Sequence, residues 1–256
     1  MTSALTASFV TPIKLDEMEI KMYKKQGFLV IPGLLDPQKV NAVRNEVLNN
    51  VRLACGSKSS KLAQTGQYTK DSLLDTMINS EEALSIVEQL LGGASTVYLP
   101  FSAVKSSNGG GEFHFHQDNQ YTTLDGPALN MWIALNDMTP ENGCLGICPG
   151  SHKAGTLESV ESPDKDSHRT VNYKIEEFLP LRMRAGDAVV FDRLTVHGSG
   201  KNLTNQDRVA YAVQFNRNDV NARFQGEKEF IPLSIRPRSN TKPVDAIKNL
   251  KESQED

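Results

Sequence analysis

Hydrophobic positions in the first third of the chain recur every three or four residues, which is the spacing of an amphipathic helix. Residues 15–26 and residues 80–93 both show this pattern and both end at glycine, so each predicts a short helix. Between them, the apolar run at residues 28–35 predicts a buried strand. Asp36 and the proline after it predict the start of another helix, whereas the polar residues 56–70 predict a loop.

The pattern changes after residue 93 to short runs rich in β-branched and aromatic residues, separated by glycine, proline, asparagine and aspartate. Such runs predict the strands of an all-β sandwich or barrel, with the helices preceding it in the chain. The polar segment 158–177 predicts a loop or lid, because long loops in compact domains tend to be functional. The predicted strands lie in residues 95–107, 128–138, 145–151, 178–186, 187–198 and 208–216.

These patterns predict one domain, residues 1–256, that is mainly β with flanking helices. Its amino-terminal part, residues 1–93, is expected to be mainly helical, and residues 94–235 are expected to form the β core. The final stretch, residues 236–256, is expected to be a surface helix or a tail. A chain of this length can bury one large core.

Composition and charge narrow the classes of function. The 28 basic and 31 acidic residues give a net charge of -3 without a dense basic block, which argues against binding to nucleic acid. No apolar run is long enough for a membrane span, and no targeting signal is visible. Three cysteines are too few for a disulfide framework. We therefore expect a cytoplasmic protein without membrane partners, and leave a homodimer open.

The candidate chemistry begins in residues 112–121, which read EFHFHQDNQY. His114, His116 and Asp118 occupy alternate positions, so an extended chain would direct all three side chains to one face. Iron(II) that reacts with oxygen requires two imidazoles and one carboxylate on a single face. The second imidazole can come from His197, 81 residues later, if the fold brings two strands together. An ordinary polar strand is the simpler alternative.

Two further features bear on this motif. HxHxD also begins a zinc-hydrolase signature, but that signature needs a histidine where this chain has Asn119.

Arg208 follows His197 after a polar segment, and a hairpin would lay it beside the metal-bearing strand. A guanidinium buried there requires an anion such as a carboxylate. Ser199 can add a hydroxyl to the same anion. The alternatives are a surface arginine and a serine that bonds only to backbone.

Four blocks in order give the chain a family resemblance: FHFHQD, MWIALNDMTPENGCLGICPGSH, GDAVVFD and HGSGKNLTNQDR. With them, the chain resembles the phytanoyl-CoA dioxygenase family of iron(II)- and 2-oxoglutarate-dependent oxygenases. The fold implied by the resemblance is a double-stranded β-helix, a jelly-roll or cupin-like core with iron at its open end. The implied cofactors are iron(II), the cosubstrate 2-oxoglutarate and molecular oxygen.

The family resemblance also implies roles for particular residues. It implies that iron is bound by His116, Asp118 and His197, while Arg208, assisted by Ser199, holds the distal carboxylate of 2-oxoglutarate and Trp132 lies near it. A core tryptophan is the simpler account of Trp132. We expect His114 to lie beside the site, and Gln117 to be either a substrate contact or a structural hydrogen-bonding group.

The activity implied is hydroxylation, or another oxidation, of an unactivated C–H bond in a small-molecule metabolite, with release of succinate and carbon dioxide. Related halogenases replace the carboxylate of this motif with a small residue, whereas Asp118 is present here. The substrate is expected to belong to specialised or natural-product metabolism. The alternatives are a non-catalytic metal-containing β-barrel binding protein and a cupin-type dioxygenase that does not use 2-oxoglutarate.

Overall fold

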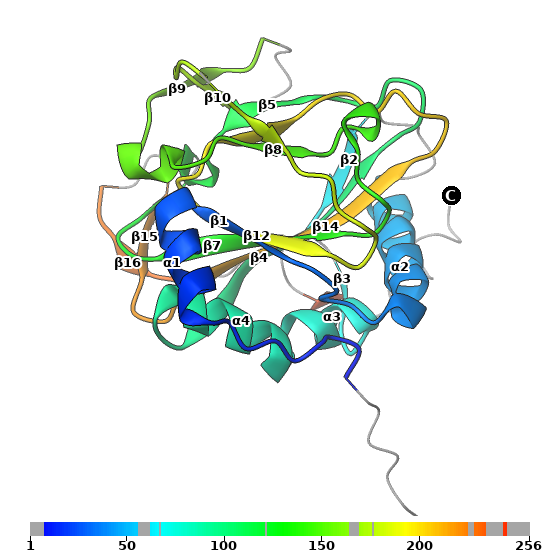
Figure 1. Cartoon of the computed structure of the whole chain (residues 1–256), viewed down its shortest axis with the longest axis horizontal. Helices are drawn as coiled ribbons and strands as arrows, with labels where there is room; N and C mark the ends of the chain where they lie inside the picture. The colour runs from blue at the N-terminus through cyan, green and yellow to red at the C-terminus, as the bar shows by residue number, and fades with distance from the viewer. Residues whose placement is uncertain are drawn as a thin grey trace, which may run out of the picture.

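Two antiparallel β-sheets packed face to face form the framework of the molecule (Figure 1). The structure is a computed structural model, and it describes residues 8–55, 62–66, 68–120, 122–163, 169–175, 177–224, 228–233 and 243–244. The larger sheet has the strand order β1 (Phe28–Ile31), β12 (Ala188–Asp192), β7 (Ala128–Ala134), β14 (Arg208–Arg217), β4 (Ser95–Lys105) and β2 (Leu62–Thr65). The smaller sheet has the order β11 (Leu179–Pro180), β8 (Leu145–Ile147), β13 (His197–Ser199) and β5 (Phe113–His116). This architecture confirms the predicted double-stranded β-helix.

Short secondary sheets and turns complete the β part of the molecule. They are β3 (Tyr68–Thr69) with β17 (Pro243–Val244), β6 (Thr122–Leu124) with β15 (Asn221–Phe224) and β16 (Ile231–Pro232), β9 (Ser159–Glu161) with β10 (Arg169–Val171), and the 3-10 turns η1 (Asp118–Gln120), η2 (Pro140–Asn142) and η3 (Ser151–Ala154). The predicted tail, residues 236–256, lies outside the described residues except for 243–244.

The helices cover the outer face of the larger sheet (Figure 1). Asp16 begins the first of them with a reciprocal capping box to Glu19. Asp36 accepts a hydrogen bond from the Gln38 amide at the start of the second, as the sequence predicts. Within the described residues, every helix is too short or too polar to cross a membrane. The helices are α1 (Glu17–Gln26), α2 (Pro37–Cys55), α3 (Leu73–Ile78) and α4 (Glu81–Leu91).

Three local predictions were wrong. Residues 56–70 contain the edge strand β2, which pairs with β4 and so gains backbone hydrogen bonds that its polar sequence did not indicate. The predicted lid at 158–177 contains the hairpin of β9 and β10, with residues 164–168 and 176 outside the described residues. The apolar run 187–198 is divided between β12 in one sheet and β13 in the other, because residues 193–196 cross between the sheets.

Strands β7 and β14 are buried on both faces, and their side chains alternate between two cores. One core lies between the larger sheet and the helices and receives Met131, Ile133, Val209, Tyr211 and Val213. The other lies between the two sheets and receives Trp132, Ala134, Ala210 and Ala212. Trp132 on this inner face also lines the smaller of the two cavities described below.

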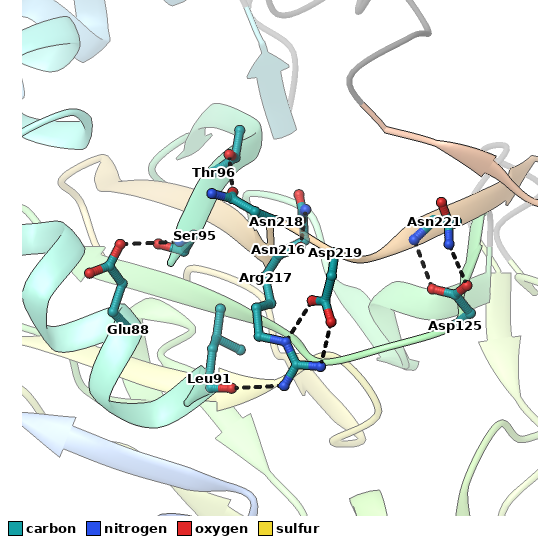
Figure 2. A network of polar contacts seen from close by, with 10 residues as sticks. All are labelled: Glu88, Leu91, Ser95, Thr96, Asp125, Asn216, Arg217, Asn218, Asp219 and Asn221. Atoms are coloured by element: carbon teal, nitrogen blue, oxygen red, sulfur yellow. Dashed lines mark hydrogen bonds and ion pairs between the residues drawn. The ribbon is translucent and has the colours of Figure 1, made fainter. Parts of the chain in front are cut away.

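Polar contacts fix the end of the sandwich where β14 leaves the larger sheet (Figure 2). Arg217 binds Asp219 through two hydrogen bonds, Nε to Oδ1 at 2.6 Å and Nη2 to Oδ2 at 2.9 Å. The third guanidinium nitrogen, Nη1, donates to the Leu91 carbonyl at the end of α4, while Glu88 accepts from the Ser95 amide at the start of β4. These contacts join α4 to the sheet at the end remote from Arg208.

Two glycines that end helices provide a matched test of packing at α1. Gly27 and Gly92 both follow a helix with positive φ, 81° and 72°. A Cβ on Gly92 meets nothing within 4 Å, whereas one on Gly27 would contact His152 and lie 2.6 Å from Thr195 Oγ1. Gly92→Ala should cost about 1–2 kcal/mol from backbone strain alone. Gly27→Ala should cost at least about 1 kcal/mol more because of overpacking, measured by urea unfolding; equal losses would contradict this.

Candidate metal centre

The pairing of β5 with β13 brings His116 and His197 opposite each other across two neighbouring strands. Their ring centroids are 4.3 Å apart. Asp118 Oδ1 lies 3.9 Å from His116 Nε2 and 3.7 Å from His197 Nε2. Each of the three residues thus offers a ligand atom within 4.8 Å of the others. Two imidazole nitrogens and one carboxylate oxygen at this spacing can bind one divalent ion and leave other positions on it open.

Hydrogen bonds behind the three ligands orient the atoms that face the centre. His116 Nδ1 lies 2.8 Å from the His114 carbonyl oxygen, and His197 Nδ1 lies 2.9 Å from that of Thr195. Since a carbonyl only accepts, each Nδ1 carries the proton, and each Nε2 is the nitrogen that can bind a metal. Asn130 donates to Asp118 Oδ2 at 3.1 Å, which leaves Oδ1 for the ion.

Asp118 does not belong to the strand that carries His116. Strand β5 ends at His116, and Asp118 begins the turn η1, so simple alternation does not place the carboxylate. The side chain of Gln117 fixes this change of direction: it donates to the carbonyls of Gly155 and Leu194 and accepts from the Leu157 amide. These bonds favour the structural role for Gln117 over the predicted substrate contact.

Arg208 reaches the site from the opposite sheet, so the predicted hairpin beside the metal-bearing strand was wrong. It begins β14 in the larger sheet, while His197 lies on β13 in the smaller one. The segment between them crosses from one sheet to the other, and buried Asn202 holds it by donating to the carbonyls of Lys105, Ser106 and Gln206. The alternation of β14 directs Arg208 to the inner face, together with Ala210.

The guanidinium of Arg208 is buried with donors unused. Arg208 is 2% exposed, and its Cζ lies 5.4 Å from the Trp132 ring centroid. Its Nε and Nη1 atoms have no hydrogen-bond partner. Burial lowers the pKa of the guanidinium to about 10. An unpaired buried guanidinium edge is costly unless a ligand satisfies it, and a carboxylate is the natural bidentate partner. The residues therefore fit a carboxylate-bearing cosubstrate.

Lys105 contacts this site through Ser199, and it was not predicted from the sequence. It is opposite Arg208 in the pairing of β4 with β14 and is fully buried. Its Nζ donates to Ser199 Oγ at 2.7 Å, to the Ser199 carbonyl at 3.0 Å and to the Gly200 carbonyl. Because Ser199 Oγ accepts this bond, its own hydroxyl proton remains available to an anion. The sequence feature that could have revealed Lys105 is its position two residues after Ala103 in an apolar strand, which places both side chains on the inner face.

The charge state of Lys105 is balanced between opposing effects. Burial, and secondarily the charge of Arg208, lower the pKa of its ammonium group to about 6. Three oxygen acceptors, however, match the three N–H donors of the charged form. An anion placed beside Lys105 and Arg208 would favour the charged form, so occupancy of the site and protonation of Lys105 are coupled.

Two cavities meet at His116 and Asp118. The smaller, of about 60 Å³, lies between the sheets and is lined by His116, Asp118, His197, Trp132, Ser199 and Arg208. The larger, of about 410 Å³, also includes His116 and Asp118 and extends past His114 toward Tyr98 and Arg193. An ion at the three ligands would therefore face one small space that contains Arg208 and one larger space suited to a small molecule.

A double-stranded β-helix with a His-x-Asp and distant His cluster, beside a buried arginine, defines the class of iron(II)- and 2-oxoglutarate-dependent oxygenases. The family model described as phytanoyl-CoA dioxygenase matches residues 23–210. The chain belongs to this family, and it is an iron(II)- and 2-oxoglutarate-dependent dioxygenase that acts on a small molecule.

Individual relatives agree with this assignment. The chain is 33% identical over 261 residues to a phytanoyl-CoA dioxygenase of Arabidopsis thaliana, covering 82% of this chain and 90% of the relative. It is 29% identical over 226 residues to the L-proline trans-4-hydroxylase of Streptomyces griseoviridis, covering 76% and 84%. Among solved structures, EvdO2 from Micromonospora carbonacea var. aurantiaca, complexed with 2-oxoglutarate, has a similar fold, with a TM-score of 0.68 at 19% identity over 88% and 98% of the two chains.

His114 and His116 offer a matched pair for testing the metal ligands, because they lie two residues apart on one strand. His116→Ala should lose bound iron, since it removes one of the three ligand atoms. His114→Ala should retain stoichiometric iron, because its side chain lies outside the cluster of ligand atoms. Metal content after anaerobic loading and desalting measures both. Iron lost as fully from His114→Ala as from His116→Ala would contradict the assignment.

The pKa of Lys105 predicts that binding of 2-oxoglutarate takes up a proton above pH 6. The free amine is mostly neutral there, and the bound dianion favours the ammonium form. Affinity should weaken as pH rises from about 6 to 8, with a slope that approaches about tenfold per pH unit. Calorimetry of manganese-loaded protein, in buffers of different ionisation enthalpy, measures the uptake.

Lys105→Met should abolish this proton uptake, and Lys201→Met, at an exposed position nearby, should preserve it. The same uptake in the parent protein and in Lys105→Met would assign the proton to another group.

Proposed function

We propose that His116, Asp118 and His197 bind iron(II) and that Arg208, Ser199 and Trp132 surround 2-oxoglutarate in the smaller cavity. The observation that carries this proposal is the buried, unpaired edge of Arg208 in the same cavity as the three ligands. A metal alone would leave those donors unsatisfied. A dicarboxylate that reaches from the metal to Arg208 would satisfy them and place its other end at the ion.

Iron(II), when bound with 2-oxoglutarate and oxygen, supplies oxidation of an unactivated C–H bond with release of succinate and carbon dioxide. The chain supplies the geometry. Asn130 and two backbone carbonyls hold the ligand atoms toward one point, and Arg208 with the Ser199 hydroxyl fixes the far carboxylate of the cosubstrate. The apolar residues Phe101, Leu145 and Phe191 line the smaller cavity and exclude water from it.

The larger cavity is the proposed place of the substrate. It meets the smaller cavity at His116 and Asp118, so a C–H bond of a bound molecule can approach the ion from that side. We propose a metabolite of specialised or natural-product metabolism. Relatives that oxidise small molecules support this, including ectoine dioxygenase from Stutzerimonas stutzeri.

Arg208 also argues against the two alternative functions. Neither a metal-containing binding protein without catalysis nor a cupin-type dioxygenase that uses no 2-oxoglutarate explains a guanidinium that is buried without a partner beside the ligands.

We further propose that the chain acts as one domain over residues 1–256, with residues 94–235 as its β core. We propose that it works in the cytoplasm, and a homodimer is compatible with this activity.

Anaerobic titration with 2-oxoglutarate tests the proposed cosubstrate site. The iron(II)-loaded protein should develop the weak visible charge-transfer band of the metal chelate. Arg208→Ala should weaken the binding about thirtyfold or more, because it removes a buried charge partner of the distal carboxylate. Arg182→Ala is the control, since this arginine is exposed. The proposal fails if metal-loaded, folded parent gives no band, or if Arg208→Ala binds like the parent.

A further inference from the structure

The larger cavity has an uneven distribution of charge. Two guanidinium groups, of Arg193 and Arg169, are among the described residues that line it, and Asp118 is the one acidic residue among them. Since the metal neutralises Asp118 in the proposed function, no other carboxylate of this lining faces Arg193. Leu99, Phe101 and Phe113 form an apolar part of the same lining.

Arg193 carries a buried charge surrounded by neutral acceptors. The residue is 5% exposed and donates from Nη1 to Gln214 Oε1 at 3.0 Å, from Nη2 to the Thr122 carbonyl at 2.9 Å and from Nε toward Asn119 at 3.4 Å. Its Cζ lies 5.1 Å from the Tyr98 ring centroid. In the described part of the chain it forms no ion pair with a carboxylate within 4 Å. These contacts hold the guanidinium rigidly through neutral acceptors, while the charges of Asp118 and Asp192 act on it without a direct ion pair.

The neighbouring carboxylate lies outside the lining of the cavity. Asp192, which precedes Arg193 in the chain, accepts a hydrogen bond from the Leu194 amide at 2.8 Å. Arg169 also lines the cavity, and its Nε donates to Ser159 Oγ at 2.7 Å in the β9–β10 hairpin. An anionic ligand would bring a carboxylate to Arg193 on the side of the cavity.

We propose that the substrate carries a carboxylate, which Arg193 binds in the larger cavity while the reacting C–H bond faces the metal. This inference rests on the proposed function and adds the class of substrate to it. A cavity of about 410 Å³ accommodates a small organic acid or an amino acid with room for its side chain.

Gln214→Glu is the sharpest test, because it supplies the missing carboxylate from within. The new Glu would take the place of the amide that already contacts Arg193, form an internal ion pair with it and compete with the carboxylate of a ligand. The change preserves side-chain size and leaves the arginine in position. Arg193→Gln, which removes the charge itself, is the second variant.

The probes are small carboxylic acids, amino acids among them, each paired with its own primary amide. Their binding to zinc- and 2-oxoglutarate-loaded protein is measured by ligand-observed NMR at millimolar concentration. Acids should bind the parent, their amides should bind about tenfold more weakly or worse, and both variants should lose the acids to a similar degree. No binding by any acid, equal binding of acids and amides, or unchanged binding to Gln214→Glu would each overturn the proposal.

A separate readout keeps this test distinct from that of the proposed function. The charge-transfer band of iron(II) and 2-oxoglutarate should appear in the parent and in Gln214→Glu alike, since Gln214 does not line the smaller cavity. If the band forms and the acids fail to bind, the substrate inference fails alone. If the parent forms no band, the proposed function fails whatever the acids do.

Discussion

The register between β5 and β13 is the constraint on which the site depends. It sets His116 opposite His197, and a shift of one residue would turn one imidazole to the other face of the sheet. The register is secured on both sides, because β13 also pairs with β8, and because Gly198 lies so close to the backbone of Phe113 that a Cβ there would come within 2.8 Å of its carbonyl oxygen. The metal geometry thus follows from backbone pairing.

The second constraint is electrostatic. Lys105 and Arg208 lie opposite each other on adjacent strands, both buried, so the protein places a guanidinium cation beside an amine that is mostly neutral above pH 6, in a region of low dielectric. The arrangement is unfavourable by itself and becomes favourable when a dianion enters. Rigid placement before binding reduces the reorganisation that binding requires, which is the general basis of preorganised recognition. Arg193 in the larger cavity is likewise a buried cation that neutral hydrogen-bond acceptors hold in place.

The sequence predicted the fold and most of the site because those features leave local signals. Helix caps such as Asp36, alternating runs such as β4, and the His-x-Asp pair are all visible in the chain. The position of Arg208 was not predictable from local signals, since a polar segment between two strands can be a hairpin or a crossing between sheets. Only the packing of two sheets decides between them.

The roles of Lys105 and Gln117 also could not be predicted from local sequence signals. The alternation of β4 does direct Lys105 inward, yet a lysine at the end of an apolar run is usually read as the exposed end of a strand. Gln117 satisfies backbone groups more than thirty residues away, and such partners leave no trace in sequence spacing. Long-range polar contacts are therefore the part of the site that pattern reading misses.

The cavity between the two sheets also has a consequence for the stability of the chain. Strands of both sheets form its walls, so the cosubstrate enters a space that exists before it arrives. A ligand that fills this space and pairs with buried Arg208 binds the folded chain, and mass action then favours folding. Bound 2-oxoglutarate would thus protect the chain from unfolding, and from proteolysis of the unfolded state, as well as take part in the reaction.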